Sequence, residues 1–168
     1  MKTLFIALRS LVYMTGFILL FGWIALGVRS FDREFGLVLP AWTGIAGIVI
    51  MLVGASLALA CAATFVVKGR GTPAVFDPPS EFLSVGPYKY VRNPMYIGGF
   101  ILLVGFGLYQ RSVSILLLSL VLLLLTHLAV VSLEEPNLEK RFGQSYIDYK
   151  KSVSRWVPKW KRGISSGQ

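Results

Sequence analysis

Long apolar runs dominate the pattern of hydrophobic and polar positions along the chain. They extend from Leu4 to Val28, from Trp42 to Val67 and from Tyr96 to Leu133. A helix needs about 20 predominantly apolar residues to cross the hydrocarbon core of a bilayer. Each of the first two runs therefore predicts one transmembrane helix. The third predicts two, with a turn near residues 109–111. We expect an all-α integral membrane protein with about four transmembrane helices.

The first run begins with the basic residues Lys2 and Arg9 and so resembles a signal peptide. It is long, however, it has no convincing small-x-small cleavage site, and further spans follow it. We therefore interpret it as a retained first helix.

Composition agrees with a membrane protein. The 168 residues are 55% hydrophobic with a mean hydropathy of +0.67, which is too apolar for a soluble domain. Gly54, Ala58 and Ala62 recur every four residues in the second run, a pattern that lets transmembrane helices approach closely. The single cysteine, Cys61, cannot form an internal disulfide, and we interpret it as a small buried apolar residue.

The positive charge lies mainly in three segments. Of 17 Lys and Arg residues, two precede or begin the first span, four lie in residues 68–92 and eight follow Leu133. Cytoplasmic segments are enriched in Lys and Arg, so we expect both termini and the large loop to face the cytoplasm of a bacterial inner membrane. The net charge of +9 then favours contact with anionic lipid headgroups over nucleic acid.

Two polar segments adjoin the spans. Residues 68–94 are rich in Pro and Gly and predict an ordered loop. In Pro136–Val153 the apolar and aromatic residues recur at steps of three or four, which predicts one amphipathic helix at the interface. Trp156 and Trp160 suit the headgroup region. We expect a single membrane domain that comprises an N-terminal helical pair (1–70), a functional region (71–158) and a flexible tail (159–168).

Three ionisable residues stand near the end of the fourth predicted helix. His127 is the only histidine, and Glu134 follows it after about two helical turns, on the same face if the helix continues. Such groups at membrane depth indicate a functional site, although a neutral histidine bonded to a neighbouring helix is the alternative. Glu134 and Glu135 are unfavourable at a helix C-terminus, so we expect compensation by Arg92, Arg141, Arg155 or a cationic ligand. A solvated pair is the alternative.

The stretch "GPYKYVRNPMYIGG", residues 86–99, presents Arg92 between tyrosines just before the third apolar run. The planar guanidinium suits a carboxylate or a phosphate, and tyrosine rings provide faces for stacking. This loop is suited to a polar cofactor at the membrane edge, or it is an interfacial anchor.

Together, this stretch, the apolar hairpin and "EEPNLEKRFGQSYIDYKKSVSRWVP" resemble the isoprenylcysteine carboxyl methyltransferase family, which is similar to the phospholipid methyltransferases. The matching blocks cover about residues 71–158. The resemblance implies a pocket for S-adenosylmethionine at the cytoplasmic ends of the last helices, and a lipid-like or small hydrophobic acceptor that enters from the bilayer. The implied cofactor-binding residues are Tyr88, Tyr90, Arg92, Asn93, Pro94, Tyr96, His127, Glu134, Glu135, Leu138 and Tyr146. The implied catalytic residues are Arg92, His127, Glu134 and Arg155.

One position departs from the family pattern, because Asn93 stands where histidine is usual. Asparagine cannot carry a proton near neutral pH, so a general base at this position is not expected. Methyl transfer from a sulfonium depends mainly on alignment and exclusion of water, and no metal site is expected. If the acceptor is a carboxylate, Arg92 or Arg155 would orient it; if it is an amine or a thiol, Glu134 or His127 is the candidate base.

Two other functions fit parts of the sequence. Some membrane reductases of sterols that use a nicotinamide cofactor have a similar C-terminal region, although this chain is short for that group. A non-catalytic membrane subunit with the same fold is the other alternative.

Overall fold

The computed structural model describes residues 2–36, 38–69 and 84–159, and the described part is helical without strands. The prediction of an all-α membrane protein is confirmed. In chain order, the helices are α1 (Lys2–Val28), α2 (Ser30–Phe35), α3 (Thr43–Thr64), the π-helix η1 (Phe65–Gly69), the 3-10 helix η2 (Gly86–Lys89), α4 (Pro94–Tyr109), α5 (Val113–Ala129), the π-helix η3 (Val130–Glu134), α6 (Glu135–Phe142) and α7 (Gln144–Ser152).

Three of the helical segments are long and apolar enough to cross a membrane: Phe5–Glu34, Thr43–Val67 and Val113–Phe142. The fourth expected span is α4, which is apolar but has only 16 residues. At about 1.5 Å per residue its length is about 24 Å, somewhat less than the roughly 30 Å of a hydrocarbon core. The turn expected at residues 109–111 is present, because α4 ends at Tyr109 and α5 begins at Val113.

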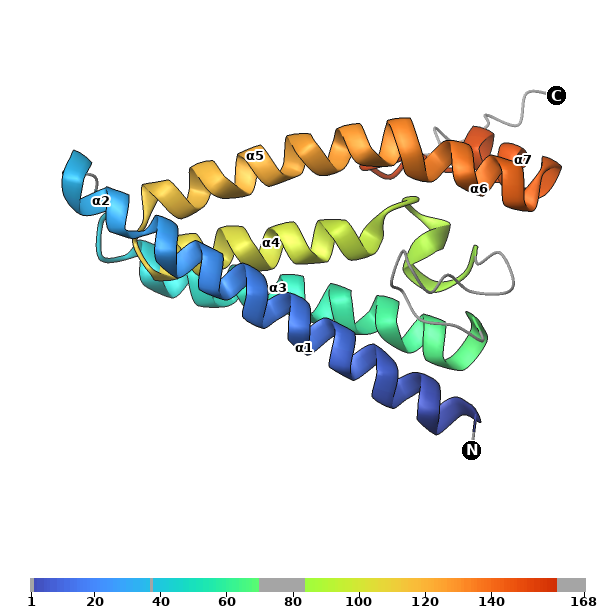
Figure 1. Cartoon of the computed structure of the whole chain (residues 1–168), viewed down its shortest axis with the longest axis horizontal. Coiled ribbons are helices and arrows are strands. Elements are labelled where there is room, and N and C mark those ends of the chain that lie inside the picture. The colour runs from blue at the N-terminus through green and yellow to red at the C-terminus, as the bar shows by residue number, and fades with distance from the viewer. Residues whose placement is uncertain (1, 37, 70–83, 160–168) are drawn as a thin grey trace, which may run out of the picture.

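Glycines determine how closely α3 and α4 pack. Side by side in Figure 1, the two helices meet at Gly47 and Gly54 of α3 and at Gly98 and Gly105 of α4. A Cβ atom added at Gly54 would lie 2.5 Å from the backbone nitrogen of Leu102. The backbones are therefore in direct contact, as the small-residue spacing in the sequence indicates for part of this interface.

At the end of the molecule where α2 lies, polar contacts connect α2 to α5 and cap the first turn of α5. The backbone N–H of Ser114, in the first turn of α5, donates to Oδ1 of Asp32 on α2 at 2.9 Å. Ser112 caps the same helix, its hydroxyl accepting from the N–H of Ile115 at 3.1 Å. These bonds satisfy two N–H groups that no helical carbonyl can reach.

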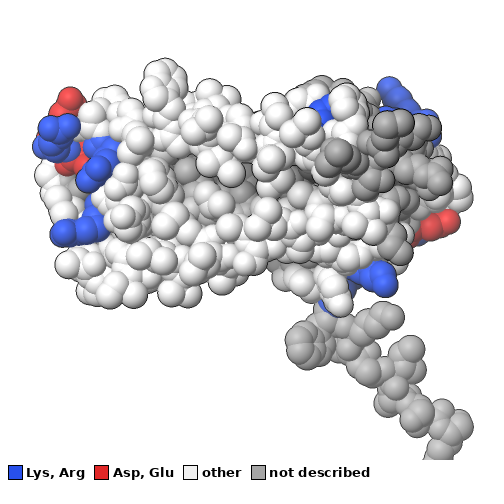
Figure 2. Space-filling view, turned by 90° about the horizontal axis from the view of Figure 1, so that it is seen from below, with Lys and Arg blue, Asp and Glu red and all other residues white. Residues whose placement is uncertain are grey.

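Charged residues gather at the two ends of the molecule. On the face shown in Figure 2, the middle carries no Lys, Arg, Asp or Glu among the described residues. Figure 1 places the beginning of α1, α6 and α7 at one end and α2 at the other. An uncharged middle between two charged ends, as on this face, is the surface expected of a membrane-embedded helical protein.

The prediction of a single amphipathic helix for Pro136–Val153 is wrong in the number of helices. The segment forms two helices, α6 and α7, separated at Gly143. Gly143 has φ 56° and ψ −133°, a conformation that side chains rarely adopt, so glycine permits the change of direction.

Helix α6 continues α5 through the π-turn η3. Pro136, the second residue of α6, has no N–H to donate to the preceding turn, and its ring would collide with the carbonyl four residues earlier. A widened turn just before the proline relieves that collision.

Most of the large loop predicted between α3 and α4 falls on residues 70–83, and the predicted flexible tail, with Trp160, falls on residues 160–168 apart from Lys159. Both lie outside the described residues.

Candidate functional site

The site is built where residues 153–159, which we call the C-terminal strap, return from α7 to the beginning of α4. The backbone N–H of Arg92 donates to the carbonyl of Ser154 at 2.8 Å, and Val91 and Ser154 form an isolated parallel bridge. The Asn93 amide donates to the carbonyl of Arg155 at 3.4 Å. The strap therefore holds the two sequence blocks of the methyltransferase resemblance against each other.

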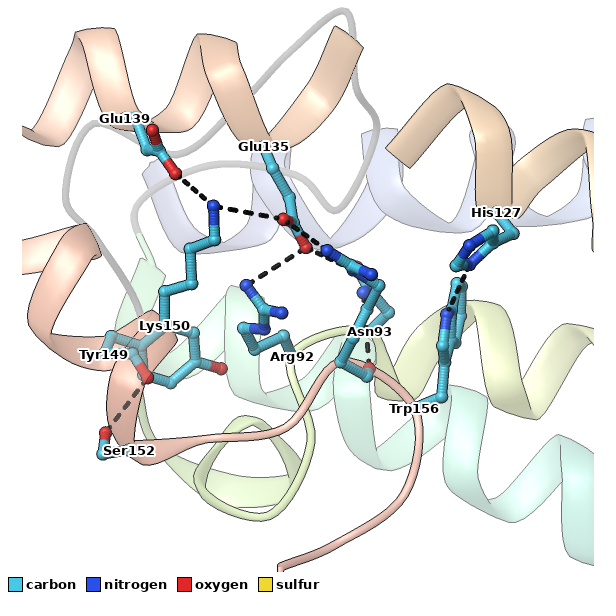
Figure 3. A network of polar contacts seen from close by, with 10 residues as sticks. Arg92, Asn93, His127, Glu135, Glu139, Tyr149, Lys150, Ser152 and Trp156 are labelled. Atoms are coloured by element: carbon cyan, nitrogen blue, oxygen red, sulfur yellow. Dashed lines mark hydrogen bonds and ion pairs between the residues drawn. The ribbon is translucent and has the colours of Figure 1, made fainter. Parts of the chain in front are cut away.

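Glu135 is the centre of a cluster of charges at this place (Figure 3). Its side chain is only 4% exposed. Arg155 binds it with two parallel bonds, Nε to Oε1 at 2.6 Å and Nη2 to Oε2 at 2.9 Å. Arg92 Nη1 lies 3.1 Å from Oε1. A buried carboxylate with these partners is stable in the charged form, because ion pairs and hydrogen bonds replace its lost hydration.

Lysine 150 joins this cluster to the surface. Its ammonium lies 3.6 Å from Oε2 of Glu135 and 2.5 Å from Oε1 of Glu139. With Lys150 included, three cations surround the buried Glu135 carboxylate, and only Lys150 has a second carboxylate among the described residues. In the described part of the cluster, three cations therefore contact two carboxylates, Glu135 and Glu139.

Arg92 carries hydrogen-bonding capacity that its described neighbours do not use. Its side chain is 8% exposed, and its Nε and Nη1 atoms are buried without a hydrogen-bond partner. The short distance from Nη1 to Glu135 is an ion pair whose angles do not make a hydrogen bond, so the two observations agree. Buried N–H groups without partners are costly, and this arrangement suits an anionic group of a ligand.

The first of the two adjacent glutamates has a different environment. Tyr96, in the first turn of α4, donates its hydroxyl to Oε2 of Glu134 at 3.0 Å, and the glutamate is half-buried. No cation lies within ion-pair distance of Glu134 among the described residues. The two neighbouring carboxylates thus differ: Glu135 is neutralised by cations, whereas Glu134 has only the Tyr96 hydroxyl as a polar partner among the described residues.

Two tyrosines of α7, Tyr146 and Tyr149, lie near the Arg92 guanidinium of the cluster. Burial raises the pKa of Tyr146 to about 12; the negative charge of Glu135 adds to the rise and the Arg92 guanidinium opposes it. Burial likewise raises the pKa of Tyr149, whose hydroxyl donates to the carbonyl of Tyr88 at 2.6 Å. These phenols stay protonated at physiological pH and act as hydrogen-bonding walls, not as bases.

A groove of about 410 Å³ adjoins the cluster between α4 and α5. It is lined by Ile97, Phe100, Ile101, Leu123, Leu124, His127 and Trp156. At its polar end the Trp156 indole donates to Nδ1 of His127 at 3.0 Å, as Figure 3 shows. The volume lies within the range of small-molecule sites.

The structure brings most of the predicted site residues to one end of the bundle, but not all into one contact. Arg92, Glu135 and Arg155 form the ion-pair centre, and buried Asn93 and Pro94 lead from it into α4. Tyr90 is 66% exposed and has no described contact with the cluster. Leu138 is half-buried on α6, and Tyr88 packs edge-on against Phe65.

Sequence reasoning missed two residues of the candidate site, Lys150 and Trp156. Lys150 was one of many basic residues in the tail, and only its packing one turn before the strap identifies it. Trp156 was interpreted as a headgroup anchor, yet it bonds to His127. Its position next to Arg155 was the available signal, because a strap that aims Arg155 at Glu135 also brings its neighbour close to α5.

Comparison with known proteins agrees with the motif analysis. A family model described as phospholipid methyltransferase matches residues 42–145, which is more than half of the chain. The match covers α3 to the beginning of α7 and confirms the resemblance to the isoprenylcysteine and phospholipid methyltransferase group. A comparison with curated proteins found no match.

Proposed function

Because the chain belongs to the phospholipid methyltransferase family, we propose that it is a membrane enzyme that transfers a methyl group from S-adenosylmethionine to a lipid-like or small hydrophobic acceptor. The acceptor atom is a carboxylate oxygen, an amine nitrogen or a thiol sulfur.

The observation that carries this proposal is the buried Arg92 guanidinium, two of whose nitrogen atoms have no hydrogen-bond partner among the described residues. S-adenosylmethionine has a carboxylate, and a guanidinium can bind a carboxylate with two parallel bonds. The residues present fit the cofactor for this reason. Arg92 would hold the carboxylate, while Glu135 keeps the guanidinium in place.

Glu134 and Tyr96 would serve the cationic part of the same ligand. S-adenosylmethionine supplies a sulfonium-bound methyl group, which is already strongly electrophilic. Glu134 has no cationic partner among the described residues, so its negative charge favours a cationic ligand nearby. The Tyr96 hydroxyl fixes the direction of the carboxylate.

Asn93 and the outer tyrosines complete the proposed cofactor site. Asn93 is buried and holds the strap through Arg155, so its role is to position and not to move a proton. Tyr88 and Tyr146 are half-buried and buried, and they would limit the access of water. Exclusion of water leaves an attacking nucleophile poorly solvated and so speeds the displacement.

Methyl transfer in proteoliposomes tests the proposal. The purified chain would be supplied with S-adenosylmethionine labelled in its methyl group, and with either phosphatidylethanolamine or a farnesylcysteine carboxylate as acceptor. We expect label in the organic phase with one of these acceptors, and its loss in Arg92→Ala. Absence of transfer to either, by a protein that also fails to bind S-adenosylhomocysteine, would contradict the proposal.

A further inference from the structure

The hydrogen bond between Trp156 and His127 fixes which imidazole nitrogen carries a proton. An indole N–H can only donate, so Nδ1 of His127, 3.0 Å away, must present a lone pair. A charged imidazolium has protons on both nitrogens and could not accept this bond. The bonded ring is therefore neutral, with its proton on Nε2.

This Nε2–H is the one hydrogen-bonding group of the pair that is still available. Of the seven residues that line the groove, the other five are Ile, Leu or Phe. The indole N–H and Nδ1 are used by each other, and no partner for Nε2 exists among the described residues. A donor without a partner at the end of an apolar groove is suited to an acceptor atom on an otherwise apolar ligand.

The polar end of the groove lies beside the charged cluster (Figure 3). Trp156 follows Arg155, which binds Glu135, and Ile97 follows Tyr96, which binds Glu134. The groove itself lies between α4 and α5, among apolar helices. A ligand with an apolar chain and a polar head could therefore place its head between His127 and the cluster.

We propose that Trp156 is a positioning residue that holds His127 as a hydrogen-bond donor to an oxyanion, a carboxylate or a phosphate, of the lipid-like methyl acceptor. This inference rests on the proposed function. It also removes His127 from the candidate bases, because a ring with its lone pair bonded to Trp156 cannot accept a proton. For an amine or thiol acceptor, Glu134 remains as the candidate base.

The proton position can be measured directly because His127 is the only histidine of the chain. The chain would be labelled with ¹⁵N in histidine side chains and studied by NMR at pH 8 in dodecyl maltoside, which has no oxyanion. We expect a neutral ring with its proton on Nε2 and a hydrogen-bonded Nδ1. Trp156→Phe should shift the Nδ1 resonance, whereas Trp42→Phe, the same change at an exposed residue just before α3, should not.

The ligand is tested in the same samples. Three probes are added in turn: farnesylcysteine carboxylate, phosphatidylethanolamine and, as a control without an oxyanion, dioleoylglycerol. We expect the Nε2–H resonance to shift with one of the first two probes and not with the third. Whichever probe shifts it identifies the oxyanion as a carboxylate or a phosphate.

Variants of His127 separate positioning from mere packing. Glutamine can place an N–H near the position of Nε2, whereas asparagine reaches only the position of Nδ1. We expect His127→Gln to retain the transfer rate better than His127→Asn, and Trp156→Phe to raise the KM for the acceptor about tenfold, the size of a lost hydrogen bond to a charged group. Affinity for S-adenosylhomocysteine should be unchanged in Trp156→Phe.

Three results would overturn the inference: a proton on Nδ1 in the wild-type chain, an Nδ1 resonance indifferent to Trp156→Phe, or an Nε2–H resonance that neither oxyanion probe moves. Failure of the wild-type chain to bind S-adenosylhomocysteine would instead contradict the proposed function. The NMR result is independent of that binding, so the two failures can be told apart.

Discussion

At the scale of single residues, Glu135 organises the site because it joins three chain segments. Arg92 comes from the segment before α4, Lys150 from α7 and Arg155 from the strap, and each interacts with the same buried carboxylate. Hydrogen bonds to Glu135 raise the pKa of Arg155, which keeps the guanidinium charged at any physiological pH. Loss of the carboxylate would leave cations close together at low dielectric.

We therefore predict that Glu135→Gln destabilises the protein by about 3 kcal/mol, the usual cost of breaking a buried ion pair from one side. Glu139→Gln is the matched control. Its side chain is 36% exposed and, among the described residues, pairs with Lys150 alone, so its loss should cost less than about 1 kcal/mol. Thermal unfolding in detergent, followed by circular dichroism, compares the two variants. Equal melting temperatures would show that Glu135 does not hold the site together.

The sequence was sufficient to select Glu134, Glu135, Arg92 and Arg155, but not Lys150 or the different partners of the two glutamates. Glu134 and Glu135 are adjacent, and an unbroken α-helix would put Glu134 on the face of His127. The π-turn η3 changes that register, so Glu135 becomes the buried residue and Glu134 meets Tyr96 instead. A π-turn depends on local strain at Pro136, which periodicity does not reveal.

At the scale of elements, the close contact between α3 and α4 gives the site a rigid base, because α4 begins directly after Arg92 and Asn93. The contact depends on glycine at positions where any Cβ would meet backbone. At Gly54 the nearest atoms, Leu102 N and Gly98 O, would lie 2.5 and 2.7 Å from it. Backbone cannot move aside as the end of a flexible side chain can.

Gly54→Ala should accordingly destabilise the protein by about 2 kcal/mol, as overpacking does. Gly22→Ala provides the control, since a Cβ at Gly22 of α1 meets nothing within 4 Å. That change should be neutral or stabilising by up to about 1 kcal/mol, because alanine is the better helix former. Melting temperatures in detergent measure both. A Gly54→Ala variant as stable as Gly22→Ala would contradict the close-packing account.

The positions of the helices were predictable where the length and the hydropathy of a segment determine them. The apolar runs located α1, α3, α4 and α5, and the polar "YQR" located the turn between the last two. The break at Gly143 was less predictable, because the amphipathic pattern continues through it and only the positive φ interrupts the helix. The strap has no periodicity, and its place depends on contacts distant in sequence, such as the bond from Arg92 to Ser154.

At the scale of the whole molecule, one end of the bundle combines two environments. The ion-pair cluster lies near α6, α7 and the beginning of α4. The apolar groove lies beside it, between α4 and α5. A water-soluble cofactor and a lipid-like acceptor could thus approach the same place from different phases. Such an arrangement requires this end to face the compartment that holds the cofactor, which we propose is the cytoplasm.

Reporter fusions test that orientation. The excess of Lys and Arg near both termini predicts that they are cytoplasmic, the same end where Figure 1 places α7 and the beginning of α1. Green fluorescent protein fused after Gln168 should fluoresce in a bacterial host, and alkaline phosphatase fused there should be inactive. The same phosphatase fused after Arg111, at the opposite end, should be active. The reverse pattern would contradict the proposed access of the cofactor.

The central claim is that Arg92 and its neighbours bind S-adenosylmethionine, and calorimetry of S-adenosylhomocysteine binding to the detergent-purified chain tests it most directly. We predict micromolar affinity, no binding of a nicotinamide dinucleotide, and loss of binding in the folded variants Arg92→Ala and Glu134→Ala. Arg33→Ala, which removes an arginine from α2 at the opposite end, should bind as the wild type does. Absence of binding by an intact, monodisperse wild-type sample, or normal affinity in both site variants, would contradict the account.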